Sequence, residues 1–417
     1  MRMSHRRPRR AALAAGAALA LLTTACGGSG FEGDENSNDS EKDSGPASLE
    51  ILIGSSGPAE TDAVTAAADK WAKDSGNEVE VIAATDLNQQ LSQGFAANKP
   101  PDVFYLSSDT FAEYASNGSL LPYAGDLENA DDFYPNLAEA FTFEDEFYCA
   151  PKDFSTLGLV INSDAWEKAG LTDDDIPTTW DELREVAKTL TSDKQAGLVT
   201  STEYQRLGAF MAEAGGGLVT DGEATADSEA NVEALEFVKS MLEEDSWQTI
   251  GDVGAGWGGE AFGTGKAAMT VEGNWIAGAL KADFPDVKYQ VAPLPEGPDG
   301  QGTLSFTNCW GIAQDSEDAE AAQDLVSFLT SADQQIEFAK AFGVMPSVQS
   351  AADAYAEEFP ELAAFVEQGE VAQTVPNQPG VTEVIADLNS KLESLEKSEP
   401  ADLLADVQEN LSSALQD

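Results

Sequence analysis

The sequence predicts an α/β protein in which parallel sheets are covered by helices. Short apolar runs alternate with helical patterns along the chain. The first unit is LEILIG (49–54) as a strand, a helical pattern that ends at Gly76, and VEVIAA (79–84) as the next strand. A further helix and the run PDVFYL (101–106) follow. Strand, helix and strand repeated in this order imply parallel sheets with helices on their faces.

Helix signals continue to the C-terminus. In TTWDEL (178–183), Thr179 is placed as an N-cap and Glu182 follows three residues later, which is the pattern of a capping box. PGVTEVIADLNSKLESL (379–395) and ADLLADVQENLSSAL (401–415) are predicted to be the last helices. The folded part is about 370 residues long, which exceeds what one hydrophobic core usually holds, so two domains are expected.

Residues 1–25 have the composition of an export signal. They hold five arginines, an apolar run from Ala11 to Leu22, and small residues before Cys26. This run is too short to remain as a membrane span. The junction LTTAC resembles the lipobox of bacterial lipoproteins, although Thr23 stands where an aliphatic residue is usual, so Cys26 is the expected lipidation site. Ordinary cleavage with Cys26 incidental is the alternative, and export of the folded or of the unfolded chain stays open.

Residues 26–48 are expected to form a flexible acidic tether. They are rich in Gly, Ser and Asp and nearly devoid of large apolar side chains. Such a segment cannot bury enough surface to fold.

Composition excludes several function classes. From Cys26 onward the chain has 75 acidic residues against 17 basic ones, a formal charge of about −58 that rules out nucleic acid as a partner. Only Arg184 and Arg206 remain for bidentate phosphate contacts. The acidic residues are spread along the chain, which indicates a solvated surface and is compatible with a saline habitat. His5 is the only histidine and leaves with the signal, so neither a catalytic triad nor a zinc site is expected, and no cofactor.

Four segments resemble the extracellular solute-binding proteins of bacterial ABC importers, in the maltose-binding-like family that takes up oligosaccharides. They occur in the family's order and the resemblance covers residues 49–417. The segments are KPPDVFYLSSDTFAEYASNGSLLPY (99–123), APKDFSTLGLVINSDAWEKAGL (150–171) followed by PTTWDEL (177–183), FGTGKAAMTVEGNW (262–275) and FGVMPS (342–347).

The resemblance implies a two-lobed fold of the type II periplasmic-binding kind, in which a ligand is trapped between two α/β lobes that close about a hinge. Lobe 1 would comprise residues 49–152 and 310–350, and lobe 2 would comprise 153–309 and 351–417. The chain crossings would lie near Pro151, Trp310 and Ser350.

Three residues are the main candidates for holding a sugar, because carboxylates bind hydroxyl groups and aromatic faces pack on sugar rings. Asp109 lies where the family places a sugar-binding carboxylate, with capping of the following helix as the alternative. Trp275 in EGNW lies at the family's stacking position, with a plain core residue as the alternative. Trp257, in the glycine-rich loop GAGWGGEAF, is either a cleft residue or a loop anchor.

Five further residues are implied as ligand contacts. Glu60 lies in a loop that lines the family's cleft, although a solvated helix start is the alternative, and Asp153 lies beside the hinge, where it could simply pair with Lys152. Ser155 stands where relatives often have an acidic contact, so this sequence departs there. The remaining two are Gln205 and Asn308.

Cys149 and Cys309 are the cysteines left if Cys26 is lipidated, and a pair is the default expectation in an exported protein. The resemblance implies that they form a disulfide, because the two hinge strands of the family lie side by side. Strand alternation would then turn Asn308 and Trp310 toward the cleft. Two buried free thiols are the alternative.

The predicted function is that of a lipid-anchored, monomeric binding component of an ABC importer. It would capture a di- or oligosaccharide on the outer face of the cytoplasmic membrane and deliver it to permease subunits that work with a separate ATPase. It would perform no chemistry. A secreted glycosidase that uses two carboxylates, or a binding protein for a non-sugar solute, are the competing interpretations.

Overall fold

A mixed sheet of ten strands runs through the part of the chain that the computed structural model describes, residues 45–55 and 57–416. The predicted export signal, Cys26 and most of the tether lie outside the described residues. Among those described, no helix combines the length and apolar character that a membrane crossing needs.

The ten strands are β1 (Ser48–Ile53), β2 (Glu78–Ala83), β3 (Val103–Ser107), β6 (Ala150–Asn162), β7 (Ala196–Thr200), β10 (Trp247–Thr249), β11 (Ala267–Gly273), β12 (Tyr289–Ala292), β13 (Thr303–Ile312) and β14 (Ala372–Thr374). Their order is β10-β7-β11-β6-β13-β3-β1-β2, with β12 added to β6 and β14 to β13. Two small hairpins consist of β4 (Thr142–Phe143) with β5 (Glu146–Phe147) and β8 (Val219–Thr220) with β9 (Glu223–Ala224).

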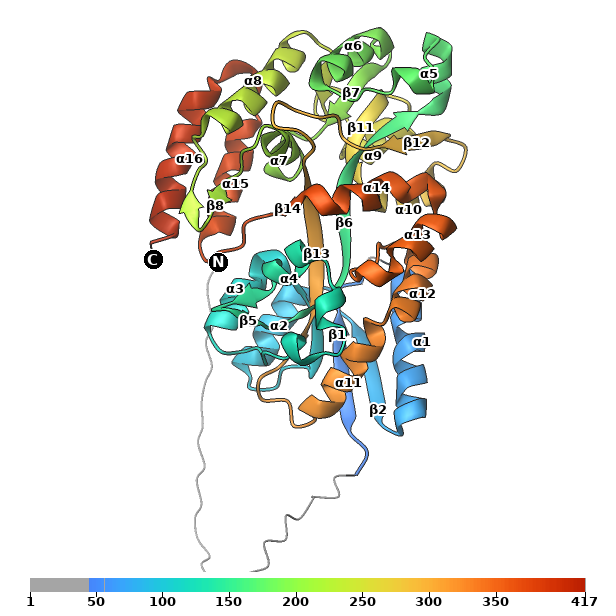
Figure 1. Ribbon diagram of the computed structural model, residues 1–417, viewed down its shortest axis with the longest axis vertical. Coiled ribbons are helices and arrows are strands. Elements are labelled where there is room, and N and C mark those ends of the chain that lie inside the picture. Colours follow the sequence, from blue (N-terminus) through green and yellow to red (C-terminus); the bar gives the residue numbers. More distant parts are fainter. Residues whose placement is uncertain (1–44, 56, 417) are drawn as a thin grey trace, which may run out of the picture. The chain divides into compact units, whose positions relative to one another are not determined.

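The helices cover the sheet as Figure 1 shows. They are α1 (Pro58–Ser75), α2 (Leu87–Ala96), α3 (Ser108–Ser116), α4 (Pro135–Ala140), α5 (Ser163–Ala169), α6 (Trp180–Leu190), α7 (Tyr204–Glu213), α8 (Glu229–Glu243), α9 (Gly258–Gly263), α10 (Trp275–Asp283), α11 (Ala319–Leu329), α12 (Ala332–Phe342), α13 (Ala352–Glu358), α14 (Ala363–Glu367), α15 (Val381–Leu392) and α16 (Pro400–Ala414).

The sheet is parallel toward its two ends and antiparallel in its centre. β1 pairs in parallel with β2 and β3, and β7 with β10 and β11, as the strand–helix–strand pattern predicts. The central strands β6 and β13, 13 and 10 residues long, are antiparallel to each other. In Figure 1 they run through the middle of the molecule and join the region of β1 to the region of β7. The α/β prediction is confirmed, while the centre of the sheet departs from purely parallel pairing.

Separate hydrophobic clusters lie toward the two ends of β6 and β13. One packs α1 and α11 on β1 and includes Ile51 and Trp71. Another packs α6, α7, α8, α15 and α16 around β7 and includes Phe210 and Leu404. Burial of apolar surface stabilises each cluster by about 25 cal/mol per Å².

Local sequence signals fix the ends of several helices. α1 ends at Gly76, whose φ of 80° is the left-handed conformation that glycine adopts without a steric cost. At the start of α6, the Thr179 side chain accepts from the Glu182 N–H at 3.3 Å, as the capping prediction requires. In a capping box the Glu182 carboxylate would also accept from the N–H of the N-cap residue Thr179. Here it accepts instead from the N–H of Thr178, one residue earlier, at 2.8 Å.

The two central strands are joined by the predicted disulfide. Cys149 and Cys309 are bonded with their Cα atoms 5.6 Å apart, and both side chains are buried. The expected orientation of Trp310 toward the cleft is wrong. Its ring packs edge-on against Tyr105 at 4.8 Å in the cluster beneath α1. At this point β13 lies between β6 and β3, where helices cover both faces of the sheet, so neither face is open.

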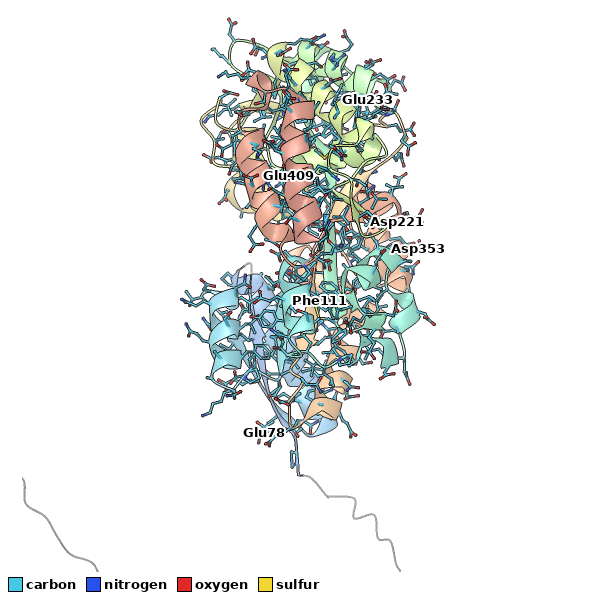
Figure 2. All side chains as sticks on the ribbon, turned by 90° about the vertical axis from the view of Figure 1, so that its left-hand side faces the viewer. Glu78, Phe111, Asp221, Glu233, Asp353 and Glu409 are labelled. Carbon is cyan, nitrogen blue, oxygen red and sulfur yellow. A yellow bond between two sulfur atoms is a disulfide. The ribbon has the colours of Figure 1, made fainter. Side chains whose placement is uncertain are left out.

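Acidic side chains cover the surface of the described part rather than forming one patch. Glu78, Asp221, Glu233, Asp353 and Glu409 come from widely separated elements and are all exposed (Figure 2). With a formal net charge of −53 for the chain, mutual repulsion acts over the entire surface.

Candidate functional site

A cavity of about 500 Å³ opens beside the middle of β6 and β13. Other parts of its wall come from the carboxyl ends of β1, β3, β11 and β14 and from the starts of α1, α3, α7 and α10. Residues 342–344 at the end of α12 complete it. Ligands of α/β sheets typically bind just outside the carboxyl ends of strands. The cavity is lined by seven of the predicted ligand contacts, namely Glu60, Asp109, Asp153, Ser155, Gln205, Trp275 and Asn308.

Trp275 provides the aromatic surface of this cavity. It is the exposed large hydrophobic residue of the described part, with 37% of its surface accessible. Its indole N–H donates to Glu272 Oε2 at 3.0 Å, and the edge of Phe306 packs on it at 5.6 Å. Gly273 lets the ring lie against the backbone, because a Cβ there would be 2.2 Å from it. These contacts fix the orientation of the ring and leave part of its surface open.

An ion pair supports the tryptophan. The Arg206 guanidinium donates to Glu272 Oε2 at 2.8 Å, and its central carbon is 5.3 Å from the centroid of the Trp275 ring. Burial raises the pKa of Glu272, while Arg206 opposes that rise. Glu272 is 1% exposed, so its carboxylate accepts hydrogen bonds from Arg206 and Trp275 and not from solvent.

Lys152 lies between two carboxylates in the wall. Its Nζ is 3.2 Å from Glu60 Oε1 and also bonds Asp153 Oδ2. The ammonium lies 4.4 Å from the centroid of the Tyr105 ring, and Glu60 hydrogen-bonds Tyr105 as well. Residues from α1, β3 and β6 thus form one buried network at the edge of the cavity.

Burial and the charge of the partner act in opposite directions on the pKa values of Lys152 and Asp153. Burial alone would lower the pKa of Lys152, but the carboxylates of Asp153 and Glu60 outweigh it and raise that pKa. Burial raises the pKa of Asp153 more than Lys152 lowers it. Burial, followed by the charges of Glu60 and Asp153, raises the pKa of Tyr105 well above its usual value. Lys152 therefore stays charged and Tyr105 neutral.

Amide and hydroxyl groups complete the wall. The Ser155 hydroxyl donates to Asn274 Oδ1, and the Asn274 amide donates to the Gly343 carbonyl at 3.1 Å. Gln205 Oε1 accepts from the Asn389 amide at 3.0 Å, and the Asn389 oxygen accepts from the first N–H of α7 at 2.7 Å. Each of these side chains is thus held by a partner before any ligand enters.

Asp109 and Asn308 lie on neighbouring elements. Asp109 is exposed in the first turn of α3, where Ser107 occupies the N-cap position and no side chain forms a capping bond. The geometry does not show Asp109 as the cap of this helix, which was the alternative role. Asn308 on β13 is paired in register with Ser107 on one side and Asp153 on the other.

Residues 66–367 match the family described as bacterial extracellular solute-binding protein. The chain belongs to this family. A Brucella abortus protein named as a binding protein is 26% identical over 344 residues, which cover 79% of this chain and 83% of that protein. The diacetylchitobiose-binding protein DasA of Streptomyces coelicolor is 24% identical over 276 residues, which cover 63% of this chain and 64% of DasA.

The solved structure of the cyclic α-maltosyl-1,6-maltose binding protein of Arthrobacter globiformis is similar to this solute-binding protein throughout. The TM-score is 0.80 at 24% identity, and the match covers 89% of this chain and 100% of that one. The fold is therefore the two-lobed α/β fold of maltose-binding-like proteins, as the sequence motifs predict.

Trp257 is the predicted contact that this solute-binding protein does not place at the cavity. It is the N-cap residue of α9. Its ring folds over Gly259, where a Cβ would be 2.0 Å away, and packs against a hydrophobic cluster that includes Phe262. This placement agrees with the loop-anchor alternative.

Several residues of the candidate site were not identified from the sequence. Asn274, Phe306 and Phe342 line the cavity, and Glu272 and Arg206 support Trp275 behind it. Glu272 and Asn274 could have been identified from the sequence because they belong to the same EGNW motif as Trp275. Phe306 lies two residues before Asn308 on β13, and residues two apart point to the same face of a strand, so strand periodicity pointed to Phe306 as well.

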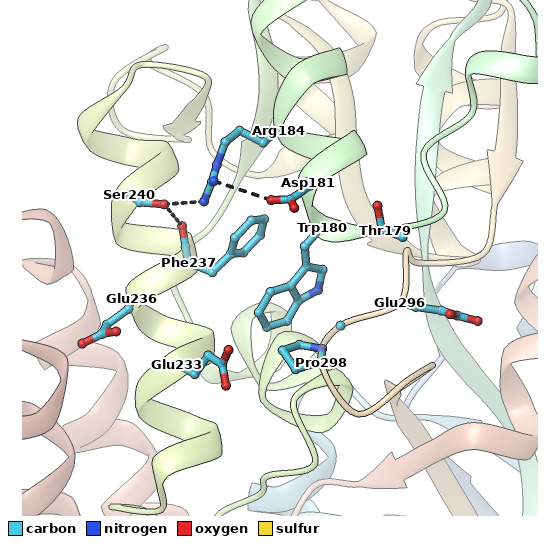
Figure 3. Close-up of a pocket in the computed structure, with 11 residues that line it drawn as sticks. Thr179, Trp180, Asp181, Arg184, Glu233, Glu236, Phe237, Ser240, Glu296 and Pro298 are labelled. Carbon is cyan, nitrogen blue, oxygen red and sulfur yellow. Dashed lines mark hydrogen bonds and ion pairs between the residues drawn. The ribbon is translucent and has the colours of Figure 1, made fainter.

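A second hollow, of about 540 Å³, lies between α6, α8 and residues 296–298 (Figure 3). Trp180 and Phe237 stack there with ring centroids 4.5 Å apart, and Arg184 donates to Ser240 at 2.8 Å. Both aromatic side chains are 8% exposed, so neither offers a face to a ligand. None of the predicted site residues lines it, and the cavity at Trp275 remains the better candidate.

Proposed function

We propose that this solute-binding protein is the lipid-anchored binding component of an ABC importer, which captures a di- or oligosaccharide between its two lobes and delivers it to the permease. Membership of an extracellular solute-binding family supports the transport role. The anchor rests on Cys26 and the lipobox-like junction before it. We further propose that the protein acts as a monomer and catalyses no reaction.

The observation that carries the sugar assignment is the pairing of an open aromatic face with fixed polar groups. Trp275 is held in place yet 37% exposed, and Glu60, Asp109 and Asp153 line the same cavity. A sugar ring packs its C–H groups on an aromatic face, and its hydroxyl groups need acceptors at defined positions. The carboxylates of the wall outnumber Lys152, which disfavours anionic solutes.

The relatives support the same class of ligand. DasA is named for diacetylchitobiose, and the protein of Arthrobacter globiformis is named for a cyclic maltosyl-maltose. The two proteins carry different sugars on one fold, so they favour a saccharide without selecting which one.

We propose lobe 1 as residues 49–152 with 310–350 and lobe 2 as 153–309 with 351–417. The two main hydrophobic clusters support this division, because one comes from the first set apart from Ala351 at its boundary, and the other comes from the second set. The cavity wall takes Asp109 from the first lobe and Trp275 from the second. A ligand that contacts both lobes stabilises their closed arrangement.

A thermal-shift screen over mono-, di- and trisaccharides tests the proposal. A ligand that binds only the folded state raises stability by about 2.7 kcal/mol when its concentration is 100 times its Kd. We expect at least one saccharide to raise the melting temperature of the wild-type protein and to lose this effect with Trp275→Ala. Stabilisation by a polyol phosphate or a peptide, and by no saccharide, would contradict the sugar assignment.

The glycosidase interpretation is tested on the same samples. Each bound saccharide is incubated with the protein and analysed by chromatography. We expect it to be recovered intact, and sustained release of monosaccharide would overturn the binding-protein assignment.

A further inference from the structure

Lys152 is the cation within the group of carboxylates that line the cavity. It is 8% exposed, and its neighbours Glu60 and Asp153 are 3% and 7% exposed. The distance from its Nζ to Glu60 Oε1 is 3.2 Å, and the bond to Asp153 Oδ2 is formed by the same ammonium. One lysine therefore compensates two buried carboxylates that come from different elements, α1 and β6.

The surroundings hold this ammonium at one place. The Tyr105 ring on β3 lies 4.4 Å from Nζ, and the Phe342 ring at the end of α12 lies 5.8 Å away. The backbone carbonyl of Lys152 accepts from the buried Gln335 amide at 3.5 Å. These contacts restrict the rotamers of the long Lys152 side chain, so its positive charge is held at one position.

The titratable groups that face Lys152 are Glu60 from α1, Asp153 from β6 and Tyr105 from β3. Across the cavity wall, Asp109 adds a further negative charge. The charge of Glu60 raises the pKa of Asp153, and the ammonium of Lys152 lowers it. Without the ammonium, the effect of Glu60 would be uncompensated in a buried site, which favours the protonated form of Asp153. A protonated Asp153 would lose an acceptor site.

We propose that Lys152 is the positioning residue of the ligand cavity: its ammonium holds the carboxylates of Glu60 and Asp153 in place and compensates their charge, so that the wall accepts hydrogen bonds from the hydroxyl groups of a neutral saccharide. The saccharide part of this inference rests on the proposed function. The network itself does not, since all its members are fixed in the ligand-free protein. Lys152 thereby determines which ligand charge the cavity accepts.

The first arm of the test needs no ligand. The melting temperatures of the wild-type protein, Lys152→Met and Lys152→Arg are measured between pH 5.5 and pH 8, with Lys288→Met as control because Lys288 forms an exposed surface pair with Asp164. In Lys152→Met, Asp153 loses the ammonium that lowers its folded-state pKa, so we expect that pKa to rise further and the stability deficit relative to wild type to be larger at pH 8 than at pH 5.5. The deficit of Lys288→Met is small and independent of pH.

The second arm measures affinity for maltose, maltotetraose and diacetylchitobiose by calorimetry at the same pH values. For each sugar that binds the wild-type protein, Lys152→Met loses about tenfold or more, as expected when a hydrogen bond to a charged group is lost, and loses more at pH 5.5 than at pH 8. Lys152→Arg retains the charge, and we expect its affinity to vary with pH as in wild type. A purely structural lysine would not change the pH profile of binding.

Two outcomes overturn the inference. One is a Lys152→Met protein with the wild-type pH dependence of stability, and the other is one with wild-type affinity and pH profile. If Lys152→Met does not fold, Glu60→Gln/Lys152→Met removes one of the two neighbouring charges, and we expect it to fold with a pH dependence of stability parallel to that of wild type; failure of this variant to fold counts against the network. If no saccharide binds the wild-type protein, the proposed function fails, and the ligand-free arm alone decides for or against the role of Lys152.

Discussion

The indole of Trp275 is held by Glu272, Phe306 and Arg206 but keeps 37% of its surface open. Trp275→Ala should therefore lower saccharide affinity several-fold or more, because the stacking surface is lost. The melting temperature of the ligand-free protein should change little, since Glu272 keeps its bond to Arg206. Calorimetry and thermal melts measure the two effects.

Trp275→Phe is the matched control for this prediction. It keeps an aromatic face but lacks the N–H that donates to Glu272, so its affinity should lie between those of wild type and Trp275→Ala. A large loss of ligand-free stability at unaltered affinity would identify Trp275 as a core residue instead.

Asp109 is exposed at the cavity wall and does not occupy the N-cap position of α3. Asp109→Asn keeps the shape of the side chain and one acceptor oxygen but removes the charge. We expect a marked loss of saccharide affinity at constant melting temperature, because hydrogen bonds to a charged acceptor are about twice as strong as neutral ones. Unchanged affinity would remove Asp109 from the site.

Motif position was enough to locate single residues but not their partners. Asp109 was predicted from the segment that follows the strand PDVFYL, and Trp275 from the EGNW motif at the end of β11. Both residues line the cavity. The pair of Lys152 with Glu60 joins residues 92 positions apart. Periodicity and local motifs carry no information about such a contact, because it depends on how α1 and β6 pack in three dimensions.

At the scale of elements, Glu213 links α7 to α6. Its side chain is fully buried, its Oε2 accepts from the Trp180 indole at 2.5 Å, and its Oε1 has no hydrogen-bond partner. Burial raises the pKa of Glu213 well above its usual value. The folded protein thus holds the proton of the Glu213 carboxyl more tightly than the unfolded chain does. The free energy of unfolding therefore falls as the pH rises above the pKa that Glu213 has in the unfolded chain.

Glu213→Gln should remove this pH dependence. The amide oxygen still accepts from Trp180, and no charge has to be suppressed. We expect the stability of the variant to increase relative to wild type as pH rises from 5 to 8, by up to about 1.4 kcal/mol for each pH unit. Chemical denaturation at each pH measures the difference. A constant difference would show that Glu213 does not titrate differently in the two states.

The disulfide links the residue just before β6 to β13. It closes a loop with a sequence separation of 160 residues. For a loop of this length the chain-entropy model gives roughly 5 kcal/mol of stabilisation. Cys149→Ser/Cys309→Ser should therefore lower the melting temperature strongly, and a reductant should have the same effect on wild type.

The bond itself is tested by mass spectrometry of non-reduced peptides from protein exported by its host. A peptide that joins the two cysteines is expected, and two free thiols would contradict it. Saccharide affinity of the reduced protein at low temperature should be close to that of wild type, because neither cysteine lines the cavity.

The elements themselves were largely predictable from local pattern. β1, α1 and β2 follow from apolar periodicity and the glycine that ends the helix. Local apolar periodicity could not predict the antiparallel pairing of β6 with β13, because the two strands are separated by a long stretch of chain. The buried position of Trp310 was missed for the same reason: alternation gives opposite faces, but only the neighbouring strands and helices decide which face is covered.

At the scale of the whole molecule, the chain has a formal net charge of −53, and its carboxylates lie on elements of both halves (Figure 2). Composition gave this charge directly, but the structure was needed to show that exposed acidic residues belong to many elements. Surface ion pairs between two exposed partners, such as Lys340 with Glu337, contribute little. Repulsion between like charges is therefore the dominant long-range electrostatic effect on the folded state.

Added salt should consequently stabilise the protein. The screening length falls from about 10 Å at 0.1 M to about 3 Å at 1 M, so repulsion between neighbouring carboxylates is largely removed. We expect the melting temperature at pH 7.5 to rise by several degrees between about 0.05 and 1 M NaCl, whereas an equal osmolality of glycine should have a smaller effect. Near pH 4.5, where the carboxylates are partly protonated, the same salt increase should raise the melting temperature less. A melting temperature that falls or stays constant with salt at pH 7.5 would show that self-repulsion does not limit the stability of this protein.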